Sequence, residues 1–219
     1  ISVLGKALSE AEHPFVAIVG GSKISDKIGV VQNLLEKVDV LMIGGGMANT
    51  FLKAKGYEMG TSLVEDDKTE LALEIMAHAE KLGKKLLIPV DVTVATAIDA
   101  PETAQTVAAD QVPSDRMALD IGPETAKIYQ DAVMNAKTIL WNGPMGVFEV
   151  DAFAVGTFAV ANAVAKSEAY SIVGGGDSVA SLERAGLNDE IDHISTGGGA
   201  SLEFLEGKKL PGIEVLQDK

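Results

Sequence analysis

The chain has 219 residues, of which 47% are hydrophobic and only 5% aromatic, and its formal net charge at pH 7 is -14. A domain of this size can bury a substantial aliphatic core, which favours parallel strands covered by helices. The negative charge argues against a nucleic-acid partner, because a polyanion would be repelled at long range. The absence of cysteine excludes disulfide bonds and thiolate metal sites and permits a reducing, cytoplasmic location.

The ends of the chain carry no sign of membrane targeting. No apolar run approaches the roughly 18 residues that span a bilayer, so we expect no membrane partner. The opening segment is not built like a signal peptide and begins with Ile1 rather than methionine, so we expect that the chain was either processed or cut from something longer. We interpret residues 1–219 as one domain, in which residues 1–13 form an amphipathic helix that leads into the sheet.

Apolar runs closed by glycine alternate with segments of helical period, which is typical of βαβ units. A helix is expected to begin near Ser25, whereas residues 91–113 lack a clean period and should contain irregular strands. The pattern predicts an α/β fold, namely a doubly wound, mostly parallel six-stranded sheet with helices on both faces, in the Rossmann-like manner. The predicted strands are residues 15–19, 40–43, 86–89, 117–119, 138–141 and 171–173, and the further helices are 47–55, 65–82, 124–136, 152–166 and 177–185.

Four glycine clusters each follow a predicted strand. In a doubly wound sheet the carboxyl ends of the strands face one side, so these turns should meet along one crevice. Glycine lets the backbone approach a ligand closely, and a following helix adds its positive end, which together favour a phosphate-bearing ligand. Each turn could also serve only a tight connection. Neither G-x-G-x-x-G nor G-x-x-x-x-G-K-[ST] is present, which argues against Rossmann dehydrogenases and Walker-type NTPases. The clusters are Gly20-Gly21, Gly44–Gly46, Gly174–Gly176 and Gly197–Gly199.

Charged residues follow two of these turns. Lys23 and Lys27 lie four residues apart, so a helix already formed at Lys23 would place both ammonium groups on one face, where they could clamp phosphates. Lysines at such positions can also be ordinary solvated surface. Asp177 follows Gly174–Gly176 at a predicted helix start, where it could be an N-cap or a Mg²⁺ ligand. The stiff loop Trp141–Glu149 could hold a carboxylate against a ribose hydroxyl.

Several segments in one order resemble the carboxy-terminal half of bacterial-type phosphoglycerate kinase. They cover nearly the whole chain and are long enough that chance similarity is not a serious explanation. The segments are GGSKISDK at 20–27, IGGGMANTFL at 43–52, LDIGPET at 119–125, WNGPMGVFE at 141–149, GGGDS at 174–178 and STGGGASLEFLEGKKLPG at 195–212.

The resemblance implies a role for particular residues. By position, Lys23 resembles the lysine that follows the migrating phosphoryl group, and Gly198 would offer it a backbone N–H. Lys27 resembles the ligand of the nucleotide phosphates, and Asp177 the Mg²⁺ ligand. Ala118 departs from the pattern, since many members have glycine at this point of the adenine pocket. The remaining nucleotide-binding positions implied are Gly21, Gly45 at the adenine slot, Asn142 near the phosphates, Glu149 at the ribose, and Gly175, Gly176 and Ser178 at the phosphate-binding helix start.

The same resemblance implies what the domain does. It would bind MgADP or MgATP, while a separate amino-terminal lobe would hold 3-phosphoglycerate or 1,3-bisphosphoglycerate for phosphoryl transfer in glycolysis. The family's basic sugar-acid site has no counterpart here, because Arg116 and Arg184 are the only arginines and neither lies in a matching motif. We therefore expect nucleotide binding without turnover by the domain alone, and a monomer. A stand-alone nucleotide-binding module and a nicotinamide-dependent oxidoreductase are the alternatives, and the latter lacks its glycine fingerprint.

Overall fold

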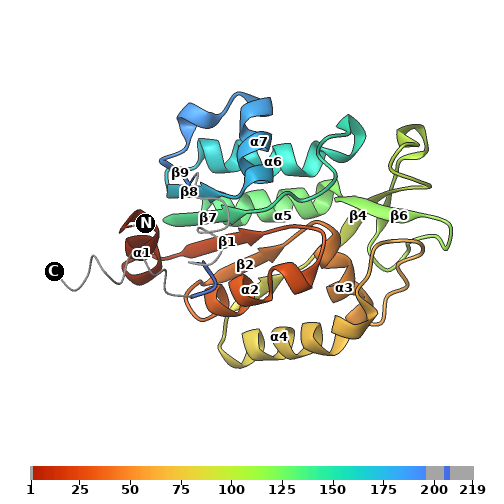
Figure 1. Cartoon of the computed structure of the whole chain (residues 1–219), viewed down its shortest axis with the longest axis horizontal. Helices are drawn as coiled ribbons and strands as arrows, with labels where there is room; N and C mark the ends of the chain where they lie inside the picture. Colours follow the sequence, from red (N-terminus) through yellow and green to blue (C-terminus); the bar gives the residue numbers. More distant parts are fainter. Residues whose placement is uncertain (1, 196–204, 208–219) are drawn as a thin grey trace.

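The computed structural model describes residues 2–195 and 205–207 of the chain, and a six-stranded parallel sheet forms its centre (Figure 1). The predicted doubly wound sheet is confirmed: the strand order is β3-β2-β1-β7-β8-β9, and every neighbouring pair is parallel. The strands are β1 (Phe15–Val19), β2 (Val40–Ile43), β3 (Lys85–Leu87), β7 (Thr138–Asn142), β8 (Tyr170–Gly174) and β9 (His193–Ser195).

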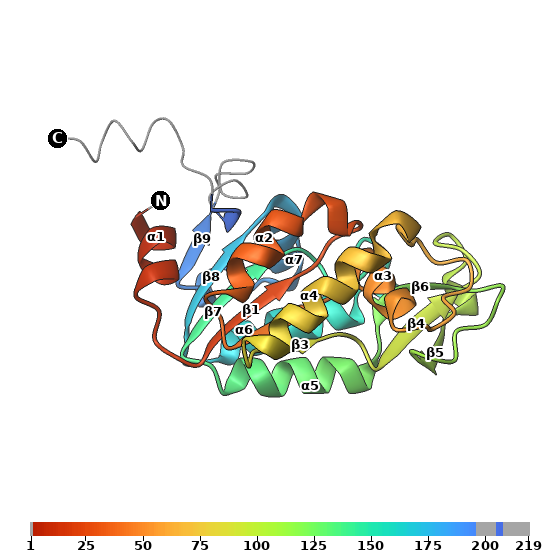
Figure 2. The same cartoon turned by 90° about the horizontal axis from the view of Figure 1, so that it is seen from below.

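Helices cover both faces of this sheet, because side chains of a strand alternate between its two faces. Phe15, Ala17 and Val19 of β1 pack in one core with residues of α2, α3 and α4, whereas Val16 and Ile18 pack in a second core with α5, α6 and α7. Figure 2 shows the two helical layers on opposite sides of the strands. The helices are α1 (Ser2–Ser9), α2 (Ile28–Leu35), α3 (Gly46–Ala54), α4 (Thr69–Lys81), α5 (Pro123–Met134), α6 (Val155–Lys166) and α7 (Gly176–Ala185).

A second sheet corrects one of the predicted strands. The run Met117–Leu119 was assigned to the parallel sheet, but β6 (Met117–Ile121) instead pairs antiparallel with β4 (Asp91–Ala95), whose other edge pairs with β5 (Gln105–Ala108). Residues 96–116, between β4 and β6, hold β5 and a short 3-10 turn rather than the crossover helix that a parallel pair needs. The three strands form a flap beyond the carboxyl ends of the main sheet (Figure 1).

The sixth strand of the main sheet is one that the sequence did not reveal. β9 contains only His193, Ile194 and Ser195 and pairs parallel with β8. Of these three residues only one is strongly apolar, so the segment lacks the hydrophobic run by which the other strands were found. The predicted helices are all present, although residues 24–26, 66–68 and 151–153 form short 3-10 turns rather than the first turns of α-helices.

The chain reverses its direction of travel across the sheet between β1 and β7. β1, β2 and β3 follow one another outward on one side, and β7, β8 and β9 do so on the other. Ligands of open parallel sheets bind outside the carboxyl ends of the strands at such a switch point. Among the described residues, none of the helices combines the length and apolar character needed to cross a membrane.

The start of α5 is held by a carboxylate from the flap. Gly122 occupies the cap position, and the buried Asp91 of β4 accepts hydrogen bonds from Glu124 N–H at 3.0 Å and Thr125 N–H at 2.8 Å. The Thr125 hydroxyl is 2.5 Å from the same carboxylate. A Cβ at Gly122 would lie 2.2 Å from the Asp91 carboxyl carbon, so glycine is needed there. Asp91 thereby locks the flap to the main sheet.

Replacing Asp91 by alanine should lower the free energy of unfolding by about 2–3 kcal/mol, because buried donors at the start of α5 would lose their acceptor. Asp91→Asn retains one carbonyl oxygen and should cost less. Urea denaturation followed by circular dichroism measures both values. A loss for Asp91→Ala no larger than that of an exposed control, Asp189→Ala, would contradict this capping role.

Candidate functional site

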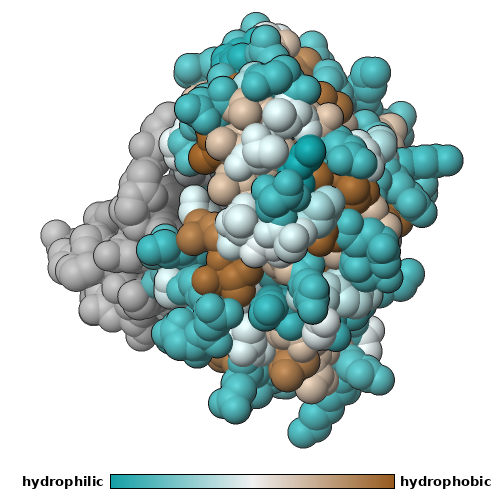
Figure 3. Space-filling model, turned by 90° about the vertical axis from the view of Figure 1, so that its right-hand side faces the viewer, coloured by the Kyte–Doolittle hydropathy of each residue, from teal (hydrophilic) through white to brown (hydrophobic). Residues whose placement is uncertain are grey.

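Two adjoining cavities lie at the carboxyl ends of the parallel strands. The smaller, of about 230 Å³, is lined by the turns after β1, β7 and β8, and the larger, of about 440 Å³, extends from the turn after β2 to the flap. They share Gly21, Ser22, Pro144 and Asp177. In Figure 3, which views the side of the molecule at which these strands end, hydrophobic residues are exposed in several areas among hydrophilic ones.

Three of the four glycine clusters meet here, as the sequence predicted. Two of them are hydrogen-bonded to the end of β7 and the loop that follows it: Gly20 N–H donates to Asn142 O at 2.9 Å, and Gly45 N–H donates to Met145 O at 3.0 Å. A Cβ on Gly45, whose φ is +73°, would lie 2.5 Å from Gly21 O, and one on Gly143 would lie 2.0 Å from Gly20 O. The cluster Gly197–Gly199, with the candidate Gly198, lies outside the described residues.

Lys23 and Lys27 both line the smaller cavity, but they do not share a helical face. Lys23 is extended, with φ -135° and ψ 136°, and α2 begins only at Ile28. The condition under which the two lysines would share a face, a helix already formed at Lys23, is therefore not met. A 3-10 turn over Ile24–Asp26 separates the lysines, and the Lys27 N–H closes it on Ile24 O at 2.9 Å. This turn brings Lys27 back to the cavity.

The Lys27 ammonium donates to the side-chain oxygen of Asn142, whose amide nitrogen donates to Gly174 O at 3.1 Å. Asn142 is buried and so links the turn after β8 to the lysine. Desolvation lowers the pKa of Lys27, while the charges of Asp177, Asp26 and Glu206 act in the opposite direction. A half-buried cation at the cavity wall that is hydrogen-bonded to a neutral amide is well suited to an anionic ligand.

Asp177 is not the N-cap of α7. The helix begins at Gly176 with Gly175 in the cap position, and no side chain caps it. The exposed Asp177 carboxylate lines both cavities. The predicted Ser178 is buried, and its hydroxyl accepts the Gly143 N–H at 2.6 Å, so it fixes the loop after β7 against the start of α7. Its backbone N–H, like those of the two preceding residues, is left over at the helix start.

The larger cavity has mainly apolar walls. Gly45 and Ala118 both line it, and the Ala118 N–H donates to the Ser62 hydroxyl at 2.8 Å. Glu149 is exposed and does not belong to the lining, although Gly146 and Val147 of the same loop do. The apolar lining residues Leu63, Val92, Ile98, Met117 and Leu119 were not among the predicted site residues, and of these only Leu119 lies in a quoted motif.

Asp120 is a further residue of the larger cavity that was not among the predicted site residues. It is 5% exposed, lines the larger cavity, and accepts hydrogen bonds from Gly156 N–H at 2.8 Å and Ile121 N–H at 2.9 Å. Burial raises the pKa of Asp120 to about 8, against the opposing effect of these two backbone bonds. A carboxylate inside an otherwise apolar strand run was the signal available in the sequence.

In the described part of the chain, no three His, Cys, Asp or Glu residues are grouped as a metal site. Two carboxylate residues, Asp26 and Asp177, line the smaller cavity. This arrangement fits Mg²⁺, which is commonly held by one or two carboxylates together with substrate phosphates.

A comparison with protein families decides the affiliation, since the family described as phosphoglycerate kinase matches residues 1–208. The chain belongs to the phosphoglycerate kinase family. It is 60% identical over its whole length to phosphoglycerate kinase from Moorella thermoacetica, covering 56% of that protein. It is 58% identical to that from Clostridium novyi, covering 55% of it. The chain thus spans a little over half the length of these curated relatives.

Solved phosphoglycerate kinases share the fold. The structure from Coxiella burnetii superposes with a TM-score of 0.94 at 50% identity, over 97% of this chain and 55% of that one. The structure from Pyrococcus horikoshii does so with a TM-score of 0.81 at 36% identity, over 99% of this chain and 55% of that one. The parallel sheet and its switch point are therefore those of the phosphoglycerate kinase family.

Replacing Gly45 by alanine should lower the free energy of unfolding by more than about 2 kcal/mol, because the new Cβ meets Gly21 backbone as well as an unfavourable φ. Gly83→Ala is the matched control, since Gly83 has a φ of +70° with nothing within 4 Å. It should cost only about 1 kcal/mol from backbone strain. Equal losses in urea denaturation would show that the close approach of the turns is not what requires glycine.

Asp120→Asn should flatten the dependence of stability on pH between about pH 4 and pH 8. The folded pKa of Asp120 is raised to about 8, and the unfolded pKa is near 3.9. Between these two pKa values, the Asp120 carboxyl group is protonated in the folded chain and ionised in the unfolded chain. The resulting stability is complete below about pH 4 and is lost as the pH rises towards 8, with a slope of up to about 1.4 kcal/mol per pH unit. Urea denaturation at pH 5 and pH 7.5 would contradict this if both proteins changed in parallel.

Proposed function

We propose that this chain is the nucleotide-binding domain of a phosphoglycerate kinase and that it binds MgADP or MgATP across the two adjoining cavities. The observation that carries the proposal is the meeting of three glycine turns, Lys23, Lys27 and Asp177 at one end of the parallel sheet. The polar, cation-lined smaller cavity suits a polyphosphate, and the apolar larger cavity suits a flat heterocyclic base.

The phosphates would be held by charge and by backbone N–H groups. Lys27, tethered by Asn142, and the exposed Lys23 supply two cations. The free N–H groups of Gly176, Asp177 and Ser178 at the start of α7 add a favourable dipole for an anion. Gly21 and Gly175 have positive φ and carry no side chain, which lets a ligand come close to the main chain.

Magnesium would be bound by Asp177 together with phosphate oxygens. When bound, the ion would neutralise charge on the phosphates during transfer. Asp177 makes no capping bond within α7, which leaves its carboxylate available. Gly45 and Ala118 would flank the adenine. Glu149, exposed in the loop after β7, would act at the ribose from the rim of the cavity rather than from its lining.

The reaction proposed for the whole protein is phosphoryl transfer between 1,3-bisphosphoglycerate and ADP in the cytoplasm. This chain would supply positioning and charge, without a covalent enzyme intermediate. Lys23 would follow the migrating phosphoryl group, and the N–H of Gly198 is proposed to assist it. Both arginines already serve internal contacts: Arg116 donates to Thr103 O, and Arg184 donates to Phe148 O and to Asp151. The acidic substrate would accordingly bind a separate amino-terminal lobe, and the domain alone would not turn over.

A stand-alone nucleotide-binding module remains the second candidate, because the glycine turns alone would suffice for binding. Adding the amino-terminal half of the Moorella thermoacetica relative in trans and assaying ATP formation separates the two. Restored activity supports the kinase domain, whereas lasting inactivity with intact MgADP binding supports the module.

Lys27→Met should weaken MgADP binding by about tenfold or more, because charge-assisted hydrogen bonds to phosphate would be lost. Asp177→Asn should instead abolish the gain in ADP affinity that Mg²⁺ provides, with little change in affinity when the metal is chelated. Isothermal titration calorimetry with and without Mg²⁺ measures both effects. Lys166→Met, at the exposed far end of α6, is the control for loss of a positive charge. Wild-type affinity in both site variants would overturn the proposed site.

A further inference from the structure

Arg116 is a partly buried cation that no part of the proposed nucleotide site uses. It immediately precedes β6, and 25% of its side chain is exposed. Its Nε is buried without a hydrogen-bond partner among the residues that the structure describes, and it lies 4.0 Å from the Asp115 carboxylate, which is too far for a hydrogen bond. Removing a guanidinium from water in this way costs free energy. The hydrogen bond that Arg116 makes to Thr103 therefore indicates what the buried side chain does.

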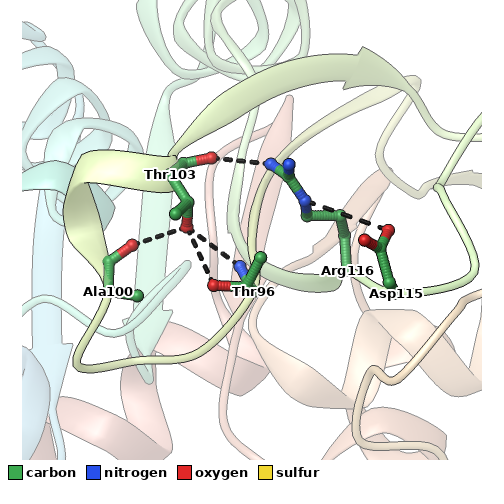
Figure 4. A network of polar contacts seen from close by, with 5 residues as sticks. All are labelled: Thr96, Ala100, Thr103, Asp115 and Arg116. Atoms are coloured by element: carbon green, nitrogen blue, oxygen red, sulfur yellow. Dashed lines mark hydrogen bonds and ion pairs between the residues drawn. The ribbon is translucent and has the colours of Figure 1, made fainter.

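That contact joins the start of β6 to the loop between β4 and β5. Arg116 Nη1 donates to the carbonyl of Thr103 at 2.8 Å. The Thr103 hydroxyl donates to Ala100 O at 2.6 Å and accepts the Thr96 N–H at 3.0 Å, which closes the base of the loop on itself (Figure 4). Hydrogen bonds within residues 96–103 thus hold the loop together, and the Arg116 guanidinium joins this loop to the start of β6.

The anchored loop carries one wall of the larger cavity. Ile98 lines this cavity although 47% of its surface is exposed, and β6 supplies Met117, Ala118 and Leu119 to the same lining. Arg116 thus spans two segments that face the same space. Without the guanidinium, the position of Ile98 would be restrained by the turn bonds within the loop and by the strands β4 and β5 at its two ends.

We propose that Arg116 is a positioning residue for recognition of the nucleotide base. By tying residues 96–103 to β6, it holds the Ile98 side chain at the cavity mouth as apolar surface for a flat heterocycle. Arg116 itself touches no ligand, and its planar fork of donors suits a fixed anchor better than a flexible ammonium. This inference rests on the proposed function and adds that part of the discrimination for the base comes from a pre-organised loop.

The test compares a ligand that has a base with one that lacks it. Arg116→Met keeps the length of the side chain but removes its donors, and it should weaken MgADP binding about fivefold, because binding must then order the loop. Magnesium pyrophosphate, which reaches only the smaller cavity, should bind the variant as it binds the wild type. Arg116→Lys should recover part of the loss. Isothermal titration calorimetry gives the affinities, and amide hydrogen exchange at Thr96 should become faster in Arg116→Met.

A double-variant cycle with Ile98→Ala separates positioning from general destabilisation. If Arg116 acts through Ile98, the double variant should bind MgADP about as weakly as Ile98→Ala alone, since coupled residues are not additive. Lys166→Met controls for the lost charge. Additive losses, or equal weakening towards pyrophosphate and ADP, would overturn the inference. An MgADP affinity of Arg116→Met equal to that of a wild-type chain that binds MgADP would also overturn it. A wild-type chain that binds neither ligand would instead overturn the proposed function itself, and this inference with it.

Discussion

The site depends on close main-chain contacts between the turns that follow three adjacent strands, β2, β1 and β7. Gly20, Gly45 and Gly143 approach the neighbouring turns so closely that a single Cβ would lie 2.8 Å or less from main-chain atoms. This contact is possible because the strands are adjacent and parallel, so that their turns leave the sheet at one edge. The two cavities, the approach of Lys27 to Asn142 and the place of α7 beside the loop after β7 all follow from that arrangement.

The fold was largely predictable because aliphatic runs and helical periods are local signals. The direction of a strand is not local, which is why Met117–Leu119 was placed in the parallel sheet although it belongs to the antiparallel flap. β9 was not predicted because it has no apolar run of its own. It is held in the sheet by its pairing with β8. Length and hydrophobicity indicate that a strand exists, and tertiary pairing decides its neighbours.

The glycine turns and their lysines were predictable because each carries a motif beside a strand. The way they come together was not. Lys23 and Lys27 reach one cavity through a 3-10 turn instead of a shared helix, and Gly175 takes the cap position that was one of the two roles considered for Asp177. The walls of the larger cavity could not be read from sequence, because residues such as Ile98 are ordinary aliphatic side chains whose place is set by long-range contacts.

The same edge of the sheet can be probed amide by amide. An NMR titration of the ¹⁵N-labelled chain with MgADP monitors every backbone N–H separately. The account predicts that the largest shifts cluster at the turns after β1, β2 and β8, at Gly21, Gly45 and Gly176–Ser178. Shifts that instead centre on the separate cavity lined by residues 56–58 and 110–113, with the glycine turns unmoved, would contradict it.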